Sequence, residues 1–103
     1  MEVRTLEEFD TWLGKLRDRN AQHRIFASVR RYQARGDVNG DIKYLGENVS
    51  EARFHFGAGY RAYFTEIEHV VIFLLIGGDK SSQQKDIIKA KQLAQKLREE
   101  GWE

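Results

Sequence analysis

Apolar residues at the start of the chain recur every three or four positions, which is the spacing of one face of an amphipathic helix. They predict a helix over residues 6–18, preceded by residues 1–4, which are compatible with a short strand. Thr5 and Glu8 have the spacing of a capping box, in which each side chain accepts a hydrogen bond from the other residue's backbone N–H. The apolar residues at helical spacing are Leu6, Phe9, Leu13 and Leu16.

A second helical repeat follows almost at once and ends near residue 36. Asn20 is a candidate N-cap, because its side chain can accept a hydrogen bond from the first backbone N–H groups of a helix. Gly36 is well placed just past the helix end, where a positive φ is wanted. Since almost no linker separates the two helices, we expect them to pack as a hairpin. The apolar stripe of this second helix is Ile25, Val29 and Tyr32.

From residue 37 onwards apolar residues alternate with polar ones, which is the period of a β-strand. Asn39-Gly40 and Gly57-Ala58-Gly59 are typical turn sequences, and short turns join antiparallel strands. The last of these strands is apolar at every position, as expected of a central strand covered on both faces, and Gly77-Gly78 should end it. The predicted strands are residues 42–45, 49–56, 60–64 and 70–76.

A third amphipathic pattern predicts a C-terminal helix after these strands. Ser81 or Ser82 can cap its first turn, and Asp79 can accept the same backbone hydrogen bonds instead. Because no repeat, low-complexity segment or linker interrupts the chain, we expect a single domain over residues 1–103. The apolar stripe of the last helix is Ile87, Ala90, Ala94 and Leu97.

The composition is that of a folded protein with almost no net charge. The 103 residues include 17 Lys and Arg against 16 Asp and Glu, which excludes a strongly polybasic nucleic-acid-binding protein. The chain has no cysteine, its longest apolar run is residues 70–76, and residues 1–10 lack the apolar segment of a signal peptide. We therefore expect a cytoplasmic protein that has no contact with a membrane.

The distribution of charge points to the candidate chemistry. Residues 37–80 contain seven acidic and only four basic residues, so those four cations stand out. Pairing about the central glycine turn places Arg53 beside Arg61, and guanidinium groups suit phosphate oxygens, so the cations together would hold a polyanion. The alternative is that the two arginines pair with Glu51 and Glu66 on a solvated face. The four cations are Lys43, Arg53, Arg61 and Lys80.

Histidines and tyrosines leave two further questions open. No two of the three histidines have a metal-ligand spacing and cysteine is absent, so we expect no metal site and no cofactor. His55 is either a proton-transfer group or an ordinary exposed strand residue. The tyrosines near the cations either stack on nucleic-acid bases or are simply good strand formers. The histidines are His23, His55 and His69, and these tyrosines are Tyr44, Tyr60 and Tyr63.

Five short motifs carry a resemblance to a known family. In chain order they are Phe9-x-x-Trp12-Leu13-x-x-Leu16, Gly40-Asp41-x-Lys43, Val49-x-Glu51-x-Arg53, Gly57-x-Gly59-Tyr60-Arg61-x-Tyr63 and Leu74-Leu75-x-Gly77-Gly78-Asp79-Lys80-Ser81-Ser82-Gln83. Together they resemble the phage Gp49-like addiction-module killer family, a branch of the RelE/ParE toxins of type II toxin–antitoxin systems. The resemblance runs from about Phe9 to Ala94, and its last block is the most specific.

This resemblance implies an α+β toxin, with an N-terminal helical hairpin packed on a twisted antiparallel β-sheet, a C-terminal helix and a concave basic face. RelE-type members cut mRNA in the ribosomal A site without a metal, by attack of a ribose 2′-OH on the adjacent phosphate. The implied catalytic residues are Arg61 as transition-state stabiliser, Lys80 as acid or phosphate clamp, and Lys43 as the nearest match to the base. The expected substrate-binding residues are Arg53, Tyr60, Tyr63 and Gln83.

Partners and alternatives follow from the same resemblance. The expected partners are mRNA, the ribosome and a cognate helix-turn-helix antitoxin, with operator DNA bound only through the toxin–antitoxin complex. The chain departs from RelE in one respect, because no tyrosine follows Tyr63, and Gln83 or Asp86 stands near the place of the RelE phenol. One alternative is a ParE-like toxin that inhibits DNA gyrase and cleaves nothing. Another is a toxin fold without activity of its own.

Overall fold

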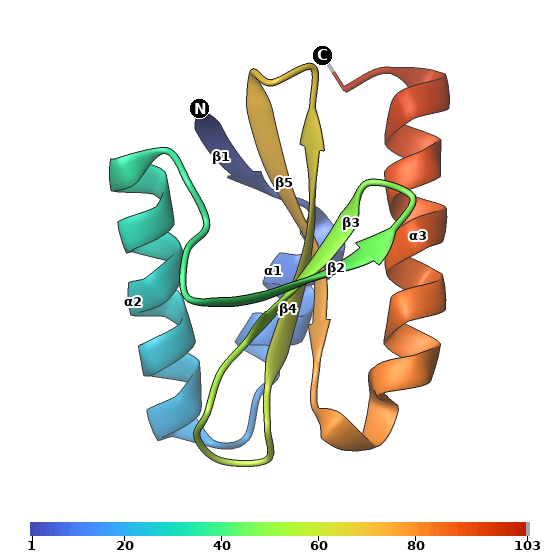
Figure 1. The fold of residues 1–103 in the computed structure, drawn as a ribbon. Helices are drawn as coiled ribbons and strands as arrows, with labels where there is room; N and C mark the ends of the chain where they lie inside the picture. Colours follow the sequence, from blue (N-terminus) through green and yellow to red (C-terminus); the bar gives the residue numbers. More distant parts are fainter. Residues whose placement is uncertain (103) are drawn as a thin grey trace.

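Five strands form a single sheet in the computed structural model of this chain, and helices cover both faces of that sheet (Figure 1). The structure describes residues 1–102. It has the α+β class that the sequence predicts. The elements in chain order are β1 (Glu2–Thr5), α1 (Glu7–Gly14), α2 (Arg19–Arg35), β2 (Asp41–Gly46), β3 (Val49–Arg53), β4 (Arg61–Ile67), β5 (Val71–Gly78), the 3-10 turn η1 (Lys80–Ser82) and α3 (Gln83–Glu100).

The sheet is mostly antiparallel, with the strand order β1-β5-β4-β3-β2. β2 pairs with β3, β3 with β4 and β4 with β5, all antiparallel, which confirms the prediction that short turns join antiparallel strands. β1 differs because it lies parallel to β5 at the edge of the sheet and makes the sheet mixed. A parallel pair needs a long connection, and everything from α1 to β4 lies between these two strands. The local pattern of four residues could not predict such a distant partner.

The helices lie on opposite faces of the sheet, with α1 and α2 on one face and α3 on the other (Figure 1). Strand β5 contributes to both cores. Leu74 packs into the core that contains Phe9 and Ile25, whereas Leu75 packs into the core that contains Leu93. All five side chains are buried. Burial on both faces therefore explains why this strand is apolar at almost every position, as predicted.

The start of α1 differs from the predicted capping box. Thr5 is the last residue of β1 and pairs with Leu74 of β5, so its backbone belongs to the sheet. Leu6 takes the N-cap position and makes no side-chain hydrogen bond there. The helix also ends earlier than predicted, at Gly14 rather than residue 18. Strand pairing has therefore taken over the residue that the local pattern assigns to a helix cap.

The predicted N-cap of α2 is wrong, and its predicted C-cap is correct. Asp18, and not Asn20, is the N-cap, because its side chain accepts a hydrogen bond from the backbone N–H of Ala21 at 3.0 Å. At the other end Gly36 adopts a left-handed φ of 79°, and its N–H donates to the carbonyl of Tyr32 at 2.8 Å, as predicted. Each of these contacts satisfies a backbone group that the helix leaves without an internal partner.

Gly77 and Gly78 are the last residues of β5 rather than the turn after it. Helices approach this end of the strand from both faces, and they leave no room for a side chain at either position. A side chain at Gly77 would overlap the indole ring of Trp12 in α1. A side chain at Gly78 would overlap the carboxylate of Asp86 in α3. The two glycines therefore allow α1 and α3 to close on the end of the sheet where the candidate site lies.

The strand boundaries around the central turn also shift. β3 ends at Arg53 rather than at residue 56, although the N–H of Phe54 still donates to the carbonyl of Tyr60 at 2.9 Å. β4 and β5 extend beyond their predicted ends to Ile67 and Gly78. The alternation of residues 54–56 therefore continues past the last regular strand pair into the turn.

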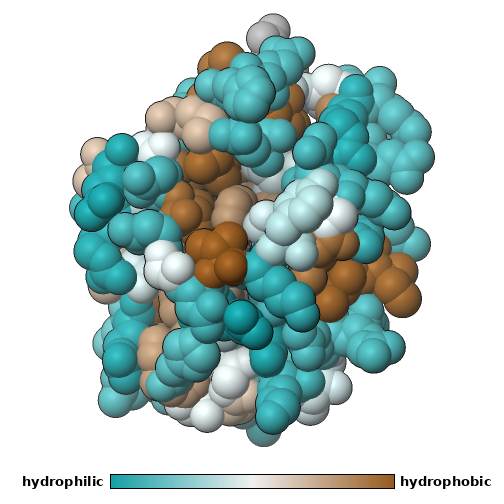
Figure 2. Space-filling model, in the orientation of Figure 1, coloured by the Kyte–Doolittle hydropathy of each residue, from teal (hydrophilic) through white to brown (hydrophobic). Residues whose placement is uncertain are grey.

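The surface is mostly hydrophilic on the side drawn in Figure 2, with hydrophobic residues gathered in a hollow near its centre. A groove on the α2 side of the sheet is lined in part by Val38, Ile42, Phe64 and Ile72.

Within residues 1–102, no helix is long and apolar enough to cross a membrane.

Candidate functional site

The register of β2, β3 and β4 places the predicted cations in two neighbouring rows. Arg53 lies opposite Arg61 of β4 and opposite Asp41 of β2. Glu51 lies opposite Lys43 on one side and Tyr63 on the other. Because directly opposite residues project on the same face, and residues two apart in a strand do so too, all of these side chains belong to the face covered by α3. The rows are Asp41–Arg53–Arg61 and Lys43–Glu51–Tyr63.

Glu51 is a buried carboxylate that joins the two arginines. No part of its side chain is exposed, and its Oε2 lies 3.5 Å from Nε of Arg61, whose side chain is only 13% exposed. The other oxygen, Oε1, lies 4.0 Å from Nε of Arg53. The amide nitrogen of Gln83 at the start of α3 donates to Oε2 at 3.0 Å. One buried negative charge therefore holds two guanidinium groups in place, and Gln83 fixes the carboxylate.

The predicted ion pairing on a solvated face is correct for Glu51 as a partner, but it is wrong for Glu66 and for the environment. Glu51 does approach both arginines, but α3 covers it. Glu66, the other proposed acid, instead lies 3.5 Å from the exposed ring of His69 in the turn after β4. The sequence pattern could not separate these cases, because alternation in a strand does not reveal which helix will cover its polar face.

Several buried polar atoms of this cluster have no hydrogen-bond partner among residues 1–102. Tyr63 is fully buried, and its pKa is raised, first by burial and then by the negative charge of Glu51. Its phenol therefore stays protonated at neutral pH and lies beneath the surface rather than on it. Unpartnered buried groups are costly in a fold and are often found where a protein works. The unpartnered atoms are Glu51 Oε1, Arg53 Nε, Arg61 Nε and the hydroxyl of Tyr63.

The β3–β4 turn and η1 form a groove of about 580 Å³ above this cluster. Arg61 donates from Nη1 to the carbonyl of Gly59 at 2.9 Å, which fixes its guanidinium at the mouth of the groove. The backbone N–H of Lys80 donates to the carbonyl of Ala58 at 3.4 Å, which holds η1 against the same turn. Lys80 itself is exposed. The cationic side chains that line this groove are Arg53, Arg61 and Lys80, with His55 beside them.

The remaining predicted residues lie around the groove in different ways. Tyr60 lines it but is almost entirely buried, with its ring 6.4 Å from Trp12 and 6.3 Å from Phe56. Gln83 reaches the cluster from below, through Glu51. Lys43 is exposed on β2, lies in the second row, and does not line the groove. The structure therefore brings Arg53, Arg61 and Lys80 together and leaves Lys43 apart.

Asp41 is a site residue that the charge pattern of the sequence does not single out. Its Oδ1 accepts a hydrogen bond from Nη2 of Arg53 at 3.0 Å, and its Oδ2 lies 2.6 Å from Nε2 of His55. The hydrogen bond with His55, and then that with Arg53, lowers the pKa of Asp41. The predicted strand over residues 42–45 stops one residue short of Asp41, so its place across from Arg53 follows only from the longer strand β2.

Helix α2 adds a second basic surface beside the groove. Its 17 residues include five arginines and neither aspartate nor glutamate. Arg24 and Arg31 line a second groove, between α2 and β3, whose other wall includes Phe54 and Phe56. The guanidinium of Arg24 lies 4.0 Å from the centre of the Phe56 ring. The two grooves adjoin one another, since residues 53–56 line both of them.

The start of the last helix is closed by its own side chains. Asp79 accepts hydrogen bonds from the backbone N–H groups of Ser81 at 2.8 Å and Ser82 at 3.3 Å and so caps η1, whereas Ser82 takes the N-cap position of α3 without a side-chain hydrogen bond to the helix. The hydroxyl of Ser82 donates to Asp86 at 2.5 Å. Burial raises the pKa of Asp86, although Ser82 opposes this rise. Asp79 therefore occupies the N–H groups of Ser81 and Ser82, and the exposed Lys80 is the basic residue of this turn.

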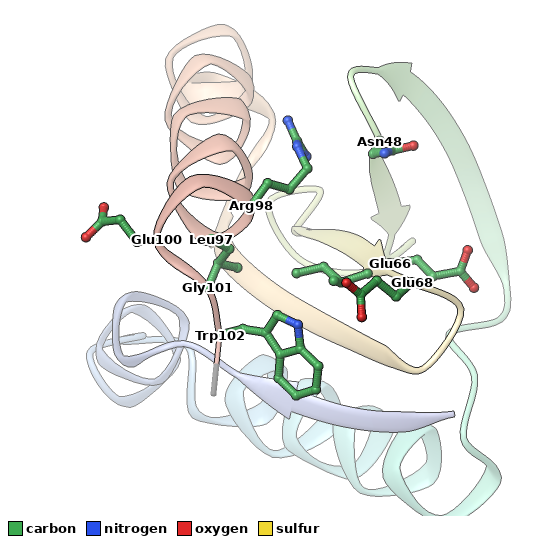
Figure 3. A pocket seen from close by; sticks show the side chains of 9 residues that line it. Asn48, Glu66, Glu68, Leu97, Arg98, Glu100, Gly101 and Trp102 are labelled. Atoms are coloured by element: carbon green, nitrogen blue, oxygen red, sulfur yellow. The ribbon is translucent and has the colours of Figure 1, made fainter.

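A further cavity of about 520 Å³ lies at the opposite end of α3, beside Trp102 (Figure 3). Arg98 and Asn48 project from α3 and from the β2–β3 turn at its edge (Figure 3). Three of its lining residues are acidic and only one is basic, so it does not suit a polyanion. The acidic residues are Glu66, Glu68 and Glu100. Across residues 1–102, no group of three or more histidine, aspartate or glutamate side chains could hold a metal ion.

The fold and the site define an α+β protein that carries a cationic groove over a buried carboxylate. The chain is 43% identical over 97 residues to a protein of Haemophilus influenzae, and this covers 94% of the chain and 96% of the relative. It therefore belongs to the same family as that protein, which is described only as uncharacterized. No family model matches the chain, and no solved structure matches it significantly.

Proposed function

We propose that the protein is the toxin of a type II toxin–antitoxin module, of the phage Gp49-like branch of the RelE/ParE superfamily, and that it is a metal-independent mRNA endoribonuclease. The observation that carries the proposal is the convergence of Arg53, Arg61 and Lys80 on one groove. These residues come from two strands and a turn that belong to three of the motifs shared with that family. An α+β fold with helices on both faces of a five-stranded sheet is compatible with it.

The proposed reaction is attack of a ribose 2′-OH on the adjacent phosphate. Negative charge accumulates on the phosphate oxygens in the transition state, and fixed cations stabilise it. Arg61 suits this role because Glu51 and the carbonyl of Gly59 hold its guanidinium from two sides. Lys80 is free to approach the phosphate or to protonate the leaving oxygen. By the resemblance, Lys43 is the candidate base.

The proposed substrate contacts extend beyond the reacting phosphate. Arg53 lines both grooves and would contact the RNA backbone. Tyr60 lies in the wall of the groove, whereas Tyr63 and Gln83 act from beneath it, through their packing around Glu51. Helix α2 supports the assignment, since an arginine-rich, acid-free helix beside aromatic rings is typical of surfaces that bind single-stranded RNA.

The proposal includes partners. The toxin would act on mRNA in the ribosomal A site, in the cytoplasm, and a cognate helix-turn-helix antitoxin would neutralise it. Operator DNA would be bound only by the complex of the two proteins. Expression of the toxin alone should therefore arrest growth of a susceptible bacterium, and co-expression of the antitoxin should restore growth.

Primer extension on cellular mRNA after brief induction tests the function. New RNA ends within the first minutes support the endoribonuclease. Growth arrest with intact mRNA and relaxed plasmid DNA would instead support a ParE-like inhibitor of DNA gyrase. Normal growth with abundant soluble protein would contradict both toxin assignments.

A pair of variants separates the role of Arg61 in catalysis from its contribution to folding. Arg61→Ala would leave the buried charge of Glu51 without its partner, so the comparison uses Glu51→Gln and the double variant Glu51→Gln/Arg61→Gln. We expect the double variant to cleave ribosome-bound mRNA about 10²–10³-fold more slowly than Glu51→Gln in single turnovers. Arg61→Lys in the same Glu51→Gln background should cleave faster than the double variant but more slowly than Glu51→Gln alone. An ammonium group supplies a positive charge but cannot form the bidentate fork of a guanidinium. Equal rates for the single and double variants would exclude Arg61 from catalysis.

A further inference from the structure

The groove is lined by a histidine, His55, that pairs with a carboxylate and for which the proposed mechanism has no role. The ring of His55 is 75% exposed, and its Nε2 lies 2.6 Å from Oδ2 of Asp41. The second oxygen of Asp41 accepts a hydrogen bond from Arg53 at 3.0 Å. Each carboxylate oxygen therefore has its own partner, and the carboxylate is fixed between them. This arrangement orients an exposed imidazole at the wall of a cationic groove.

The pairing determines which ring nitrogen faces a ligand. A carboxylate only accepts hydrogen bonds, so the hydrogen between the two groups belongs to Nε2 of His55. Nδ1 makes no hydrogen bond with any part of the chain that the structure describes. An imidazole held by a carboxylate on one nitrogen and open on the other is the arrangement of a general base. The paired carboxylate of Asp41 stays ionised because its two partners lower its pKa.

The other charged groups around His55 are cationic. Those on its own sheet and on η1 are positioned to hold a phosphodiester, and those on α2 lie across the adjoining groove. Asp41 is the acidic group in direct contact with the ring. The charged residues that line the two grooves with His55 are Arg53, Arg61 and Lys80 on one side and Arg24 and Arg31 on the other.

We propose that His55 is the general base for cleavage of an RNA phosphodiester bound in this groove, and that Asp41 is its positioning residue; this rests on the proposed function. Nδ1 takes the proton of the ribose 2′-OH while the 2′ oxygen forms a bond to phosphorus. The bond between phosphorus and the 5′ oxygen breaks with its electron pair, and this oxygen takes a proton from water. The products are a 2′,3′-cyclic phosphate and a 5′-OH, and the imidazolium returns its proton to solvent.

This assignment places the base on a residue that the resemblance does not mark. Lys43, the base by resemblance, lies in the neighbouring row and does not line the groove. The chain also has no tyrosine after Tyr63 that could transfer a proton. His55 lines the groove itself, and its Nε2 lies 2.6 Å from Oδ2 of Asp41 behind it. The geometry therefore favours His55 over Lys43 as the group that accepts the 2′-OH proton.

Single-turnover cleavage of mRNA on purified ribosomes, measured across a pH series, tests the proposal. His55→Asn and His55→Gln should each cleave at least about 100-fold more slowly than the wild type. Added imidazole should restore part of the rate of His55→Ala. Asp41→Asn should cleave more slowly than the wild type but should cost nothing further in the His55→Ala background, because Asp41 acts only through His55. A merely structural role of Asp41 would lower the rate in both backgrounds.

His69 provides a matched control, because it also pairs with a carboxylate. Its Nδ1 lies 3.5 Å from Glu66, its ring is 92% exposed, and it lies in the turn at the other end of β4. His69→Asn should cleave at the wild-type rate with an unchanged pH profile. Wild-type rates in the His55 variants, with loss of cleavage in Lys43→Gln, would overturn the base assignment and leave the proposed function intact. A wild-type protein that cleaves no mRNA would overturn the proposed function itself.

Discussion

Glu51 and Arg61 meet beneath the groove on a diagonal, with Oε2 of the carboxylate 3.5 Å from Nε of the guanidinium. They lie on adjacent strands but are not opposite one another, since Glu51 pairs with Tyr63 and Arg61 pairs with Arg53. Like charges directly opposite in a sheet are destabilising. The buried carboxylate offsets this repulsion, because it lies close to both guanidinium groups. The cluster is therefore a structural unit as well as a candidate site.

Removal of the Glu51 charge should destabilise the protein strongly. Glu51→Ala leaves the mostly buried Arg61 without a counter-charge, and loss of one partner of a buried ion pair typically costs about 3–5 kcal/mol. Glu51→Gln should cost less, because its amide oxygen can still accept the hydrogen bond from Gln83. Urea unfolding at neutral pH measures both variants. Glu66→Gln, on the same sheet but exposed, should change the free energy of unfolding by no more than about 0.5 kcal/mol. Similar losses in Glu51→Ala and Glu66→Gln would contradict the account of the cluster.

The close approach of α1 to β5 leads to a second prediction, which concerns the stability of the protein. Gly77→Ala should destabilise the protein by about 1–3 kcal/mol, because the new methyl group overlaps the ring of Trp12. The two positions should be coupled, so the cost of Gly77→Ala should fall in a Trp12→Leu background. Thermal or urea unfolding of the four proteins of this double-mutant cycle measures the coupling.

Gly14 is the matched control for that experiment. It lies in the last turn of α1, and a Cβ atom there would meet nothing within 4 Å. Gly14→Ala should therefore stabilise the protein by about 0.5–1 kcal/mol, since alanine is the better helix former. A loss of stability at Gly14 equal to that at Gly77 would show that the effect of Gly77→Ala is not steric.

The sequence predicts the elements of this fold better than their boundaries. Three helices, four antiparallel strands and the C-cap at Gly36 follow from local periodicity and turn chemistry, and the structure contains them. The local spacing of Thr5 predicts a helix cap. Its pairing with Leu74 is a contact between distant parts of the chain, and no local pattern encodes it. Tertiary pairing has overridden local preference at this residue.

Some features of the candidate site can also be predicted from the sequence, whereas others depend on tertiary packing. The pairing of Arg53 with Arg61 is predictable, because a short glycine turn fixes the register of two strands. The burial of Glu51 is not, because it depends on where α3 packs. Asp41 illustrates the intermediate case. Its place across from Arg53 follows from the register of β2 and β3, but its contact with His55 depends on the path of the chain after β3 has ended.

The cap at Asp79 should make stability depend on pH. Its hydrogen bonds with the hydroxyl and backbone N–H of Ser81, and with Ser82, lower the pKa of Asp79 below its ordinary value of 3.8. A lowered pKa in the folded state contributes stability above the ordinary value, and this contribution is lost as pH falls through the lowered value. Asp79→Asn should therefore be less stable than the wild type at pH 7, and the difference should shrink towards pH 2. Urea midpoints between pH 7 and pH 2 measure this. Asp37→Asn, which removes only an exposed ion pair with Arg35, should give a curve parallel to that of the wild type.

The basic face of α2 should contribute to RNA affinity rather than to the chemical step. Arg24 lines the groove that joins the candidate site, and its guanidinium lies over Phe56, so Arg24→Gln should weaken binding of a single-stranded RNA oligonucleotide several-fold. It should also reduce the slope of log affinity against log salt by about 1, as expected for one lost phosphate contact. Fluorescence anisotropy over a salt series measures both quantities. Arg35→Gln is the matched control, because Arg35 lies at the other end of the same helix and is already 3.4 Å from Asp37. If both variants lose affinity equally, α2 attracts RNA only through its total charge. A loss confined to Arg24 would place the RNA in the groove between α2 and β3, next to the residues proposed to cleave it.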